Sequence, residues 1–375
     1  MNRDERMKLM LIVGARPQII KSAPVIHEAL KRSEIEFQLV HTGQHYDYEM
    51  SKVFFGELGL PDPLVNLGVG SGAHAFQTGK MLMGLGKTIQ GFKPGMVVVP
   101  GDTNSTLAGA LAAVKLQVPV GHMEAGARSY DMRMPEEVNR RLTDHCSTVL
   151  FAPTKKCVET LIGEGIPRPY IELSGDTMYD ALLEHMNYAE KTDTLRKLDL
   201  TSEEYAVLTL HRPETVDTLE KLEAILKALA SMESLPIVFP VHPRTRQRLE
   251  AVKAMKRKAA VEHIKLVEPV GYHEMLQLTK HAEMVFTDSG GLQKEAFWLH
   301  TPCITLRNVT EWTETVDLGA NVLVGSDPRK IVNASRKIMD TKKVKAKLEK
   351  LRNPFGDGHA SRKIVDFILK RGWQS

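Results

Sequence analysis

The chain has 375 residues, more than one compact hydrophobic core usually holds, and this length predicts two domains of about 150 to 200 residues each. A content of 42% hydrophobic and 26% charged residues is typical of a globular protein, and no run of about 18 apolar residues predicts a membrane-spanning helix. The net charge of +4 is too small to favour a nucleic-acid partner, whereas it suits a small anionic ligand.

The N-terminus and the cysteines indicate where the protein works. The first residues carry charges of both signs and lack the apolar stretch of a signal peptide. The cysteines stand far apart and form no CxxC pair, and we interpret them as reduced core thiols of a cytoplasmic protein. They are Cys146, Cys157 and Cys303. His41 and His45 are four apart, but Gly43 between them lies in a predicted loop, so we expect no metal site.

The first half of the chain alternates predicted strands and helices. KLMLIVGARP is typical of a buried strand running into a turn, with Pro17 at the first position of the following helix. Further strands are predicted at FQLVHTG, MVVVPGD, VPVGHMEAG and STVLFAPT, with helices between them. The segment GEGIPRPYIELSGDTMYD and a charged helix, ending at about Glu204, then suggest an interdomain connection.

A second series of strands and helices follows. Its predicted strands are YAVLTL, PIVFPV, IKLVEPV, MVFTD, PCITLR and NVLVG. Such alternation indicates parallel sheets covered on both faces, and therefore two Rossmann-like α/β domains facing each other across a central cleft. We place the first domain at residues 1–172 and the second at 173–358. The last helix, within 359–375, is expected to pack back on the first domain.

In parallel α/β sheets, ligands bind beyond the carboxyl ends of the strands. Ionisable residues follow the predicted strands in both halves of the chain, namely Arg16, Asp102, Glu124, His211, His242 and Asp288. Any one of them suits a helix cap or a satisfied core position equally well. Burying each of these charges without a partner would cost roughly several kcal/mol in lost hydration. The set as a whole therefore indicates a functional site.

The stretch GHMEAGARSYDMRMPEEVNRR links one such residue to a helix. Pro135 at the helix start makes Glu136 a first-turn residue, and Arg140 follows at i+4 on the same face. One interpretation is an exposed ion pair. The alternative is that the loop from Glu124 brings Glu136 back over the cleft, giving two acid/base groups and a cation that keeps one of them ionised.

The segment TDSGGLQKEA is a candidate phosphate site. Ser289, Gly290 and Gly291 make a turn into a helix, where backbone N–H groups point at an anion, and Glu295 one turn later suits ribose hydroxyls. A tight turn without a ligand explains the same pattern. GARP, with Arg16 as its cation, looks like the counterpart in the first half. Neither GxGxxG nor GxxxxGK[ST] occurs, so the sequence contains no dinucleotide fingerprint and no P-loop.

These motifs, in this order, resemble the non-hydrolysing UDP-N-acetylglucosamine 2-epimerases. The matching segments are GARPQIIK, TGQH, PGDTNST, HMEAGARS, MPEEVNRR, GDT, LHRPE, HPR, TDSGGLQKEA and LRNVTEW. The resemblance covers nearly the whole chain. It implies the B-type glycosyltransferase fold, a homodimer, and inversion of C2 in a UDP-N-acetylhexosamine for cell-surface polysaccharide synthesis. UDP is expelled to give 2-acetamidoglucal and then added back, without a metal or redox cofactor.

The resemblance also implies roles for individual residues. The implied catalytic set is Asp102, Glu124, Glu136, Arg140 and His211. The implied UDP-binding set is Arg16, Lys21, Arg212, His242, Ser289, Gly290, Gly291, Glu295 and Arg307. Which carboxylate works on which face of C2 stays open.

The chain departs from the common bacterial form at two places. It has HRPET at residues 211–215 where that form has HRREN, which puts the contacts after Arg212 in doubt. Gln44 is a possible contact of a second, activating substrate molecule, but Asp47 stands where another glutamine is expected. The segments TGQHYDYEMS and NLGVGSGAH also look like a branch acting on uronic-acid-type UDP-sugars.

Three rival functions remain on the same fold. A hydrolysing relative would release UDP and free ManNAc, although PGDTNST, HPR and the Ser-Gly-Gly turn favour the non-hydrolysing form. A glycosyltransferase would need an acceptor site, often beside an apolar or basic membrane patch, and the sequence indicates none. A non-catalytic nucleotide-sugar sensor would not require the three carboxylates.

Overall fold

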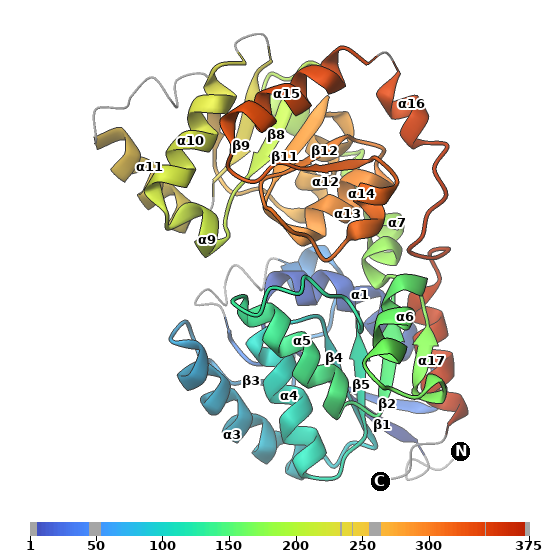
Figure 1. Ribbon diagram of the computed structural model, residues 1–375. Helices are drawn as coiled ribbons and strands as arrows, with labels where there is room; N and C mark the ends of the chain where they lie inside the picture. The colour runs from blue at the N-terminus through green and yellow to red at the C-terminus, as the bar shows by residue number, and fades with distance from the viewer. Residues whose placement is uncertain are drawn as a thin grey trace. The chain divides into compact units, whose positions relative to one another are not determined.

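The computed structural model describes residues 6–44, 54–232, 235–241, 243–254, 264–341 and 343–371. Two compact units divide the chain, one formed by Met1–Glu184 with Pro354–Ser375 and the other by His185–Asn353. Each unit contains one parallel sheet with helices packed on its faces (Figure 1). The expectation of two Rossmann-like α/β halves is therefore confirmed.

The first sheet has the order β3-β2-β1-β4-β5-β6-β7 among the described residues. Its strands are β1 (Met7–Val13), β2 (Ile35–His41), β3 (Val65–Asn66), β4 (Met96–Pro100), β5 (Val120–Met123), β6 (Val149–Ala152) and β7 (Ile171–Leu173). All pairs are parallel, with Leu9 of β1 opposite Phe37 of β2 and Met96 of β4. Continuous burial of β1, β4 and β5 explains why their sequences are apolar runs instead of alternating patterns.

The helices of this unit divide between the two faces of the sheet. They are α1 (Arg16–Leu30), α3 (His74–Phe92), α4 (Asn104–Lys115), α5 (Pro135–Cys146), α6 (Lys155–Gly163) and α17 (Ala360–Lys370). Met10 and Ile12 of β1 pack with α3 and α4 in one core. On the other face, Phe367 of α17 packs edge to face against Phe151 of β6, with the ring centroids 5.7 Å apart.

The C-terminal helix α17 is fixed to the first unit by charge and hydrogen bonds. Asp180, in α7 (Thr177–Ala189), accepts hydrogen bonds from the first N–H groups of α17 at Ala360 and Ser361, at 3.1 and 2.7 Å. Asp366 pairs with Arg32 at the end of α1, at 2.8 Å. The N-terminal dipole of α17 and its capping carboxylate thus hold the helix against this unit.

The second sheet has the order β10-β9-β8-β11-β12-β13 among the described residues. Its strands are β8 (Ala206–Thr209), β9 (Ile237–Pro240), β10 (Ile264–Val267), β11 (Met284–Thr287), β12 (Cys303–Thr305) and β13 (Asn321–Leu323). Alternate residues serve opposite faces: Leu208 and Phe286 enter one core, whereas Val207 and Val285 enter the other. Every strand predicted in this half is present.

The helices of the second unit cover both faces of its sheet. They are α8 (Thr194–Lys197), α9 (Pro213–Val216), α10 (Leu219–Ala230), α11 (Pro243–Ala254), α12 (Tyr272–His281), α13 (Gly290–Trp298), α14 (Thr313–Asp317), α15 (Pro328–Met339) and α16 (Val344–Leu348). Leu226 of α10 and Ile331 of α15 belong to the core on one face. Leu278 of α12 and Ala296 of α13 belong to the core on the other.

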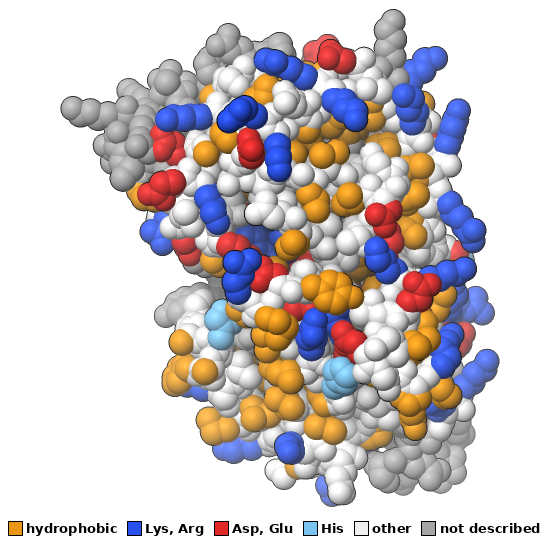
Figure 2. Space-filling view, viewed as in Figure 1, with side chains coloured by type: hydrophobic (Ala, Val, Ile, Leu, Met, Phe, Trp, Pro, Cys, Tyr) orange, Lys and Arg blue, Asp and Glu red, His pale blue; other side chains and the backbone are white. Residues whose placement is uncertain are grey.

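One segment differs from its sequence-based description. The stretch that suggested a loose interdomain connection contains β7, which pairs with β6 through Ile171 and Leu150. Its sequence IEL has a charged middle residue and only Ile171 is buried, so no apolar run marked it as a strand. No helix of the described residues is long and apolar enough to cross a membrane. Lys and Arg side chains are interspersed with Asp and Glu over the face seen in Figure 2.

Candidate active site

The strand order places the predicted site residues. In each sheet the order reverses between the first and fourth strands of the series, that is, between β1 and β4 and between β8 and β11. Loops leaving neighbouring strands in opposite directions open a crevice at such a point, where α/β proteins bind ligands. Arg16 and Asp102 follow β1 and β4, and His211 and Asp288 follow β8 and β11. The predicted residues therefore lie at the ligand-binding edge of each sheet.

Glu124 lies directly after β5 in a strained backbone conformation. Its φ angle is +69°, which is uncommon for a residue with a side chain. Its Oε1 is 2.9 Å from Nζ of Lys21 on α1, and both side chains are almost buried, with exposed fractions of 12% and 8%. A Cβ added at Gly101 would lie 2.9 Å from this Nζ, so the glycine makes room for the ion pair.

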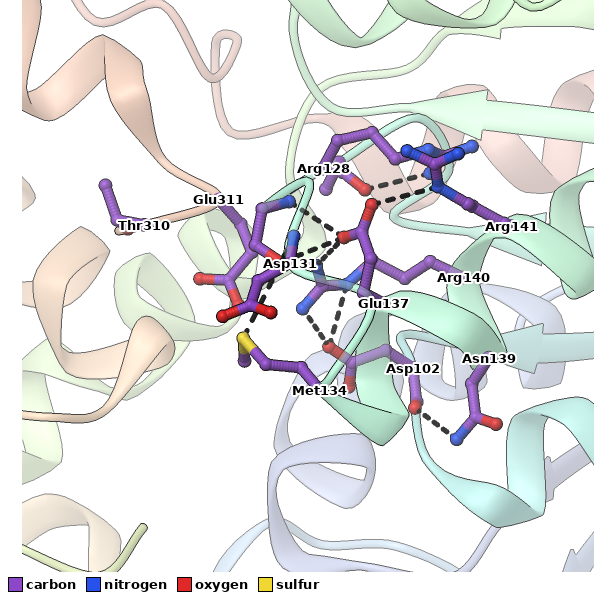
Figure 3. Close-up of polar contacts among 12 residues, drawn as sticks. Asp102, Arg128, Asp131, Met134, Glu137, Asn139, Arg140, Arg141, Thr310 and Glu311 are labelled. Atoms are coloured by element: carbon purple, nitrogen blue, oxygen red, sulfur yellow. Dashed lines mark hydrogen bonds and ion pairs between the residues drawn. The ribbon is translucent and has the colours of Figure 1, made fainter. Parts of the chain in front are cut away.

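Asp102 pairs with Arg140 of α5. Nε and Nη2 of Arg140 donate to Oδ2 of Asp102 at 3.1 and 2.9 Å, while Nη1 donates to Glu137 at 3.0 Å (Figure 3). Asn139 donates from the same helix to the backbone oxygen of Asp102 at 2.9 Å. Arg140 is buried, whereas Asp102 is 24% exposed, so one carboxylate oxygen is accessible beside a fixed cation. The sequence predicts Arg140 as the cation that keeps Glu124 or Glu136 ionised; in the structure its guanidinium pairs with Asp102 and Glu137.

Glu136 and Glu137 begin α5 after Pro135 but differ in their surroundings. Glu136 is half-buried, whereas Glu137 is fully buried. Glu137 accepts hydrogen bonds from the backbone N–H and the hydroxyl of Ser129 at 2.8 and 3.0 Å, and pairs with Arg140 and Arg141. Glu137 thus holds the loop between β5 and α5 in place. Its role was missed, although its i+3 and i+4 arginines were a visible signal.

The GARP turn differs from the expected phosphate cradle. The side chain of Gln18 accepts from the N–H groups of Gly14 and Ala15 at 2.8 and 3.2 Å, so these donors are already used inside the protein. Gln18 also donates to the backbone oxygen of Pro100 at 2.9 Å. Arg16 has its guanidinium 4.2 Å from the centre of the Phe54 ring. The Arg16 side chain is the cation of this turn.

Gln44 is also engaged within the first unit. Its Oε1 accepts from the N–H and the hydroxyl of Ser105 at 3.0 and 2.6 Å, at the start of α4. The next N–H, that of Thr106, is bonded to the capping side chain of Thr103. Asp47 and its neighbours lie outside the described residues. The possible activating role of Gln44 stays a prediction.

His211 and Asp288 form a pair at the crevice of the second sheet. Asp288 is fully buried and lies 3.1 Å from Nδ1 of His211, and it accepts from the N–H groups of His211 and Arg212 at 3.0 and 2.9 Å. Burial alone would raise the pKa of Asp288, but the charge of His211 and these hydrogen bonds hold it below its usual value. Asp288 therefore orients the ring of His211, which is half-exposed.

The Ser-Gly-Gly turn opens a helix as predicted. Ser289 is the N-cap of α13, and Gly290 and Gly291 are its first two residues. N–H groups in the first turn have no acceptor within the helix and point outward, which suits an anion. Glu295 lies one turn later and is buried. At this helix start the N–H of Ser289 is bonded to Oγ1 of Thr287 at 2.9 Å, and the N–H of Leu292 to the side chain of Ser289.

Arg307 has a close carboxylate partner. It forms a bidentate pair with Glu311, with distances of 3.0 and 3.1 Å, and both side chains are buried. A fixed guanidinium with its charge compensated gives little net attraction to a diphosphate. His242 lies outside the described residues.

Burial raises the pKa of Cys146 to about 11 and that of Cys303 to about 12, so both thiols are protonated at neutral pH. Within the described residues, no group of three potential ligands is placed to hold a metal ion.

Comparison with known proteins identifies the family. Residues 27–369 match the sequence profile of the family described as UDP-N-acetylglucosamine 2-epimerase. The UDP-N-acetylglucosamine 2-epimerase of Methanocaldococcus jannaschii is 46% identical over 368 residues, covering 96% of this chain and 99% of that protein. The UDP-2,3-diacetamido-2,3-dideoxy-D-glucuronate 2-epimerase of Pseudomonas aeruginosa is 42% identical over 369 residues, covering 97% and 100%. The chain belongs to the UDP-N-acetylglucosamine 2-epimerase family, and the resemblance found in its motifs is confirmed.

Solved structures agree with this assignment. The crystal structure of the Methanocaldococcus jannaschii enzyme in complex with UDP-GlcNAc and UDP has a TM-score of 0.90 and 45% identity, covering 97% of this chain and 100% of that one. The Neisseria meningitidis enzyme bound to UDP-GlcNAc has a TM-score of 0.89 and 31% identity, covering 97% and 100%. The two Rossmann-like units thus have the B-type glycosyltransferase fold.

Proposed function

We propose that the protein is a non-hydrolysing 2-epimerase that interconverts UDP-GlcNAc and UDP-ManNAc. Its support is the family membership together with relatives named for this activity, among them the Methanocaldococcus jannaschii enzyme. The proposed reaction has two stages. UDP leaves from C1 while a proton leaves C2, giving 2-acetamidoglucal, and UDP then adds back as a proton reaches the other face of C2.

The observation that carries this proposal is the pair of partnered carboxylates after neighbouring strands β4 and β5. Asp102 is held by Arg140, and Glu124 by Lys21. Proton removal and return on opposite faces requires at least two acid/base groups, and an adjacent cation keeps a carboxylate ionised until it accepts a proton. We propose Asp102, Glu124 and Glu136 as these groups.

The second unit supplies the proposed diphosphate contacts. Leaving-group departure requires stabilisation of the charge that grows on the diphosphate. His211, oriented by Asp288, and the first N–H groups of α13 at Gly290 and Gly291 suit that role. The rest of the proposed UDP-binding set is Arg16, Arg212, His242, Ser289 and Glu295. Lys21 and Arg307, which the resemblance also implies, are paired with Glu124 and Glu311. Joint action of both units on one substrate molecule is part of the proposal.

The test is to incubate the protein with UDP-GlcNAc in deuterated water and to follow the sugar by proton NMR. We expect UDP-ManNAc to appear with deuterium at C2 in both epimers, because the proton at C2 exchanges with solvent. Free ManNAc accumulating in step with UDP would instead assign a hydrolysing reaction. Unchanged UDP-GlcNAc, with its C2 proton retained, would reject this substrate.

A second candidate substrate is a uronic-acid-type UDP-sugar. The observation favouring it is the 42% identity to the Pseudomonas aeruginosa enzyme named for UDP-2,3-diacetamido-2,3-dideoxy-D-glucuronate. The same NMR experiment with that sugar nucleotide separates the two candidates. A much higher kcat/KM for the uronate would replace UDP-GlcNAc as the substrate while keeping the reaction at C2.

We further propose a cytoplasmic homodimer that serves polysaccharide synthesis, as its family resemblance suggests. Sedimentation velocity with and without UDP measures the assembly state. A monomer at micromolar concentration under both conditions would reject the dimer.

A further inference from the structure

His122 is a fully buried histidine that none of the proposed catalytic roles uses. It lies in β5, two residues before Glu124. Its Nδ1 is 2.6 Å from Oδ1 of Asp144 on α5, and its Nε2 is 2.7 Å from the backbone oxygen of Gly101. Gly101 immediately precedes Asp102. The ring therefore spans the distance between the turn that carries Asp102 and the helix that carries Glu136.

Asp144 extends this connection to the loop that carries Glu124. Its Oδ2 accepts from the N–H of Gly126 at 3.2 Å and pairs with Arg128 at 2.6 Å. The carboxylate is fully buried. The His122–Asp144 pair thus contacts all three segments that hold the candidate carboxylates: the turn after β4, the loop after β5, and α5.

The contacts of His122 determine its protonation. A backbone carbonyl only accepts hydrogen bonds, so Nε2 must carry a proton to bond Gly101. Asp144 lies 2.6 Å from Arg128 and accepts from the N–H of Gly126, contacts that suit carboxylate oxygens acting as acceptors. Nδ1 therefore also faces an acceptor. An imidazolium is the form of His122 that donates to both partners.

The surrounding charges are consistent with a cationic ring. Arg128 forms a bidentate pair with Glu164, at 2.9 and 2.8 Å, and burial of this arginine is outweighed by Glu164 and Asp144, which raise its pKa. His145 lies 3.4 Å from Glu164 at the edge of the network and is half-exposed. His122, Asp144, Arg128 and Glu164 form a chain of alternating charges, and loss of His122 would leave Arg128 to compensate both carboxylates.

We propose that His122, as an imidazolium paired with Asp144, is a positioning residue that sets the relative placement of Asp102, Glu124 and Glu136. It touches no substrate and acts through the backbone of Gly101 and through α5. This inference rests on the proposed function of those carboxylates. A displacement of acid/base groups by about 1 Å typically costs up to roughly 100-fold in rate, whereas binding of a distant nucleotide is little affected.

The kinetic test compares His122→Gln with His145→Gln, which changes an exposed histidine of α5 next to Asp144. Glutamine reaches one of the two acceptors but cannot donate to both from opposite ends. We expect His122→Gln to lower kcat for C2 epimerisation by roughly 10- to 100-fold with KM and UDP affinity within about threefold of wild type. The control should keep wild-type kcat. An unchanged kcat in a folded His122→Gln protein, or a loss confined to KM, would overturn the proposal.

A spectroscopic measurement keeps the proposal testable if that variant does not fold. In ¹⁵N-histidine-labelled wild-type protein at about pH 8, His122 should show two protonated ring nitrogens protected from exchange, while exposed histidines are neutral. A neutral His122 tautomer there would overturn the proposal. If the wild-type protein folds and shows the imidazolium but does not epimerise UDP-GlcNAc, the proposed substrate fails and the charge state of His122 stands independently.

Discussion

The two Rossmann-like sheets share one strand order but use their carboxyl edges differently. In the first unit, the N–H groups at the turn before α1 are occupied by Gln18, and those at the start of α4 by Gln44 and Thr103. The candidate site residues of this unit are instead carboxylates paired with cations, Glu124 with Lys21 and Asp102 with Arg140. In the second unit, α13 begins with two glycines after its N-cap, Ser289. We therefore propose proton transfer for the first unit and anion binding for the second.

This difference teaches that a glycine turn at a strand end does not by itself define a phosphate site. GARP and DSGG look equivalent as sequences. They differ at the second helical position, which is Pro17 without an N–H in α1 and Gly291 in α13, and in Gln18, whose side chain accepts from the N–H of Gly14. A helix start binds an external anion only if no internal acceptor satisfies its donors first.

We expect the largest effect, a loss of turnover, from substitutions that remove the proposed acid/base carboxylates of the first unit. Glu124→Gln keeps the shape of the side chain but cannot take up a proton, so turnover should fall by roughly 100-fold or more. Asp102→Asn and Glu136→Gln should behave alike. UDP affinity, measured by calorimetry, should change little, because the proposed diphosphate donors lie in the second unit. Glu159→Gln, exposed on α6, is the control. Loss of UDP binding with turnover per bound substrate intact would contradict the division.

We expect the next largest effect, a loss of UDP affinity, from a substitution that blocks the proposed anion site of the second unit. In Gly291→Asp, a carboxylate at the second position of α13 competes for the N–H groups and repels the diphosphate, while it favours the helix dipole. UDP affinity should fall roughly 10- to 100-fold without loss of thermal stability. Gly86→Asp adds the same charge in α3, where a side chain meets open space, and should leave affinity unchanged. Unaltered UDP binding by Gly291→Asp would remove α13 from the nucleotide site.

Gln18→Ala sharpens the comparison at the first unit. It leaves the N–H groups of Gly14 and Ala15 without their acceptor in a buried place. We expect the free energy of unfolding to drop by about 1–3 kcal/mol, the usual penalty for unsatisfied buried donors. Urea denaturation measures it, with exposed Gln90→Ala in α3 as the control. No loss of stability, together with a gain in phosphate binding, would mean that the two turns are equivalent after all.

Lys21→Met distinguishes two roles for Lys21: partner of the acid/base residue Glu124, or contact of the nucleotide. The lysine pairs with Glu124 at 2.9 Å, so its removal should change the acid/base group first. We expect kcat to fall by about 10-fold, with UDP affinity within about threefold of wild type. Lys31→Met, exposed at the end of α1, should be neutral. A fall in UDP affinity larger than the fall in kcat would instead support Lys21 as a nucleotide contact.

The sequence predicted the strands and the strand-end residues because both follow from local patterns. Apolar runs such as MVVVP mark buried parallel strands, and the rule on carboxyl ends then selects Asp102 and Glu124. The pairing of side chains could not be predicted from the sequence. Lys21 and Glu124 are 103 residues apart, and only the folded sheet brings them together. Gln18 was overlooked for a different reason: it is close in sequence to Gly14 and Ala15, but its acceptor role depends on where the turn places their N–H groups.

The smallest expected effect concerns the buried carboxylate that the second unit uses to orient His211. Because the pKa of Asp288 is lower in the folded protein, the carboxylate stabilises the fold above the unfolded-state value of about 3.9, and that contribution is lost as pH falls through the folded-state pKa. Asp288→Asn lacks this titration. The difference in unfolding free energy between wild type and variant should therefore be largest near neutral pH and shrink in strong acid. Urea denaturation across that range measures it, and a difference independent of pH would show that Asp288 holds His211 by shape alone.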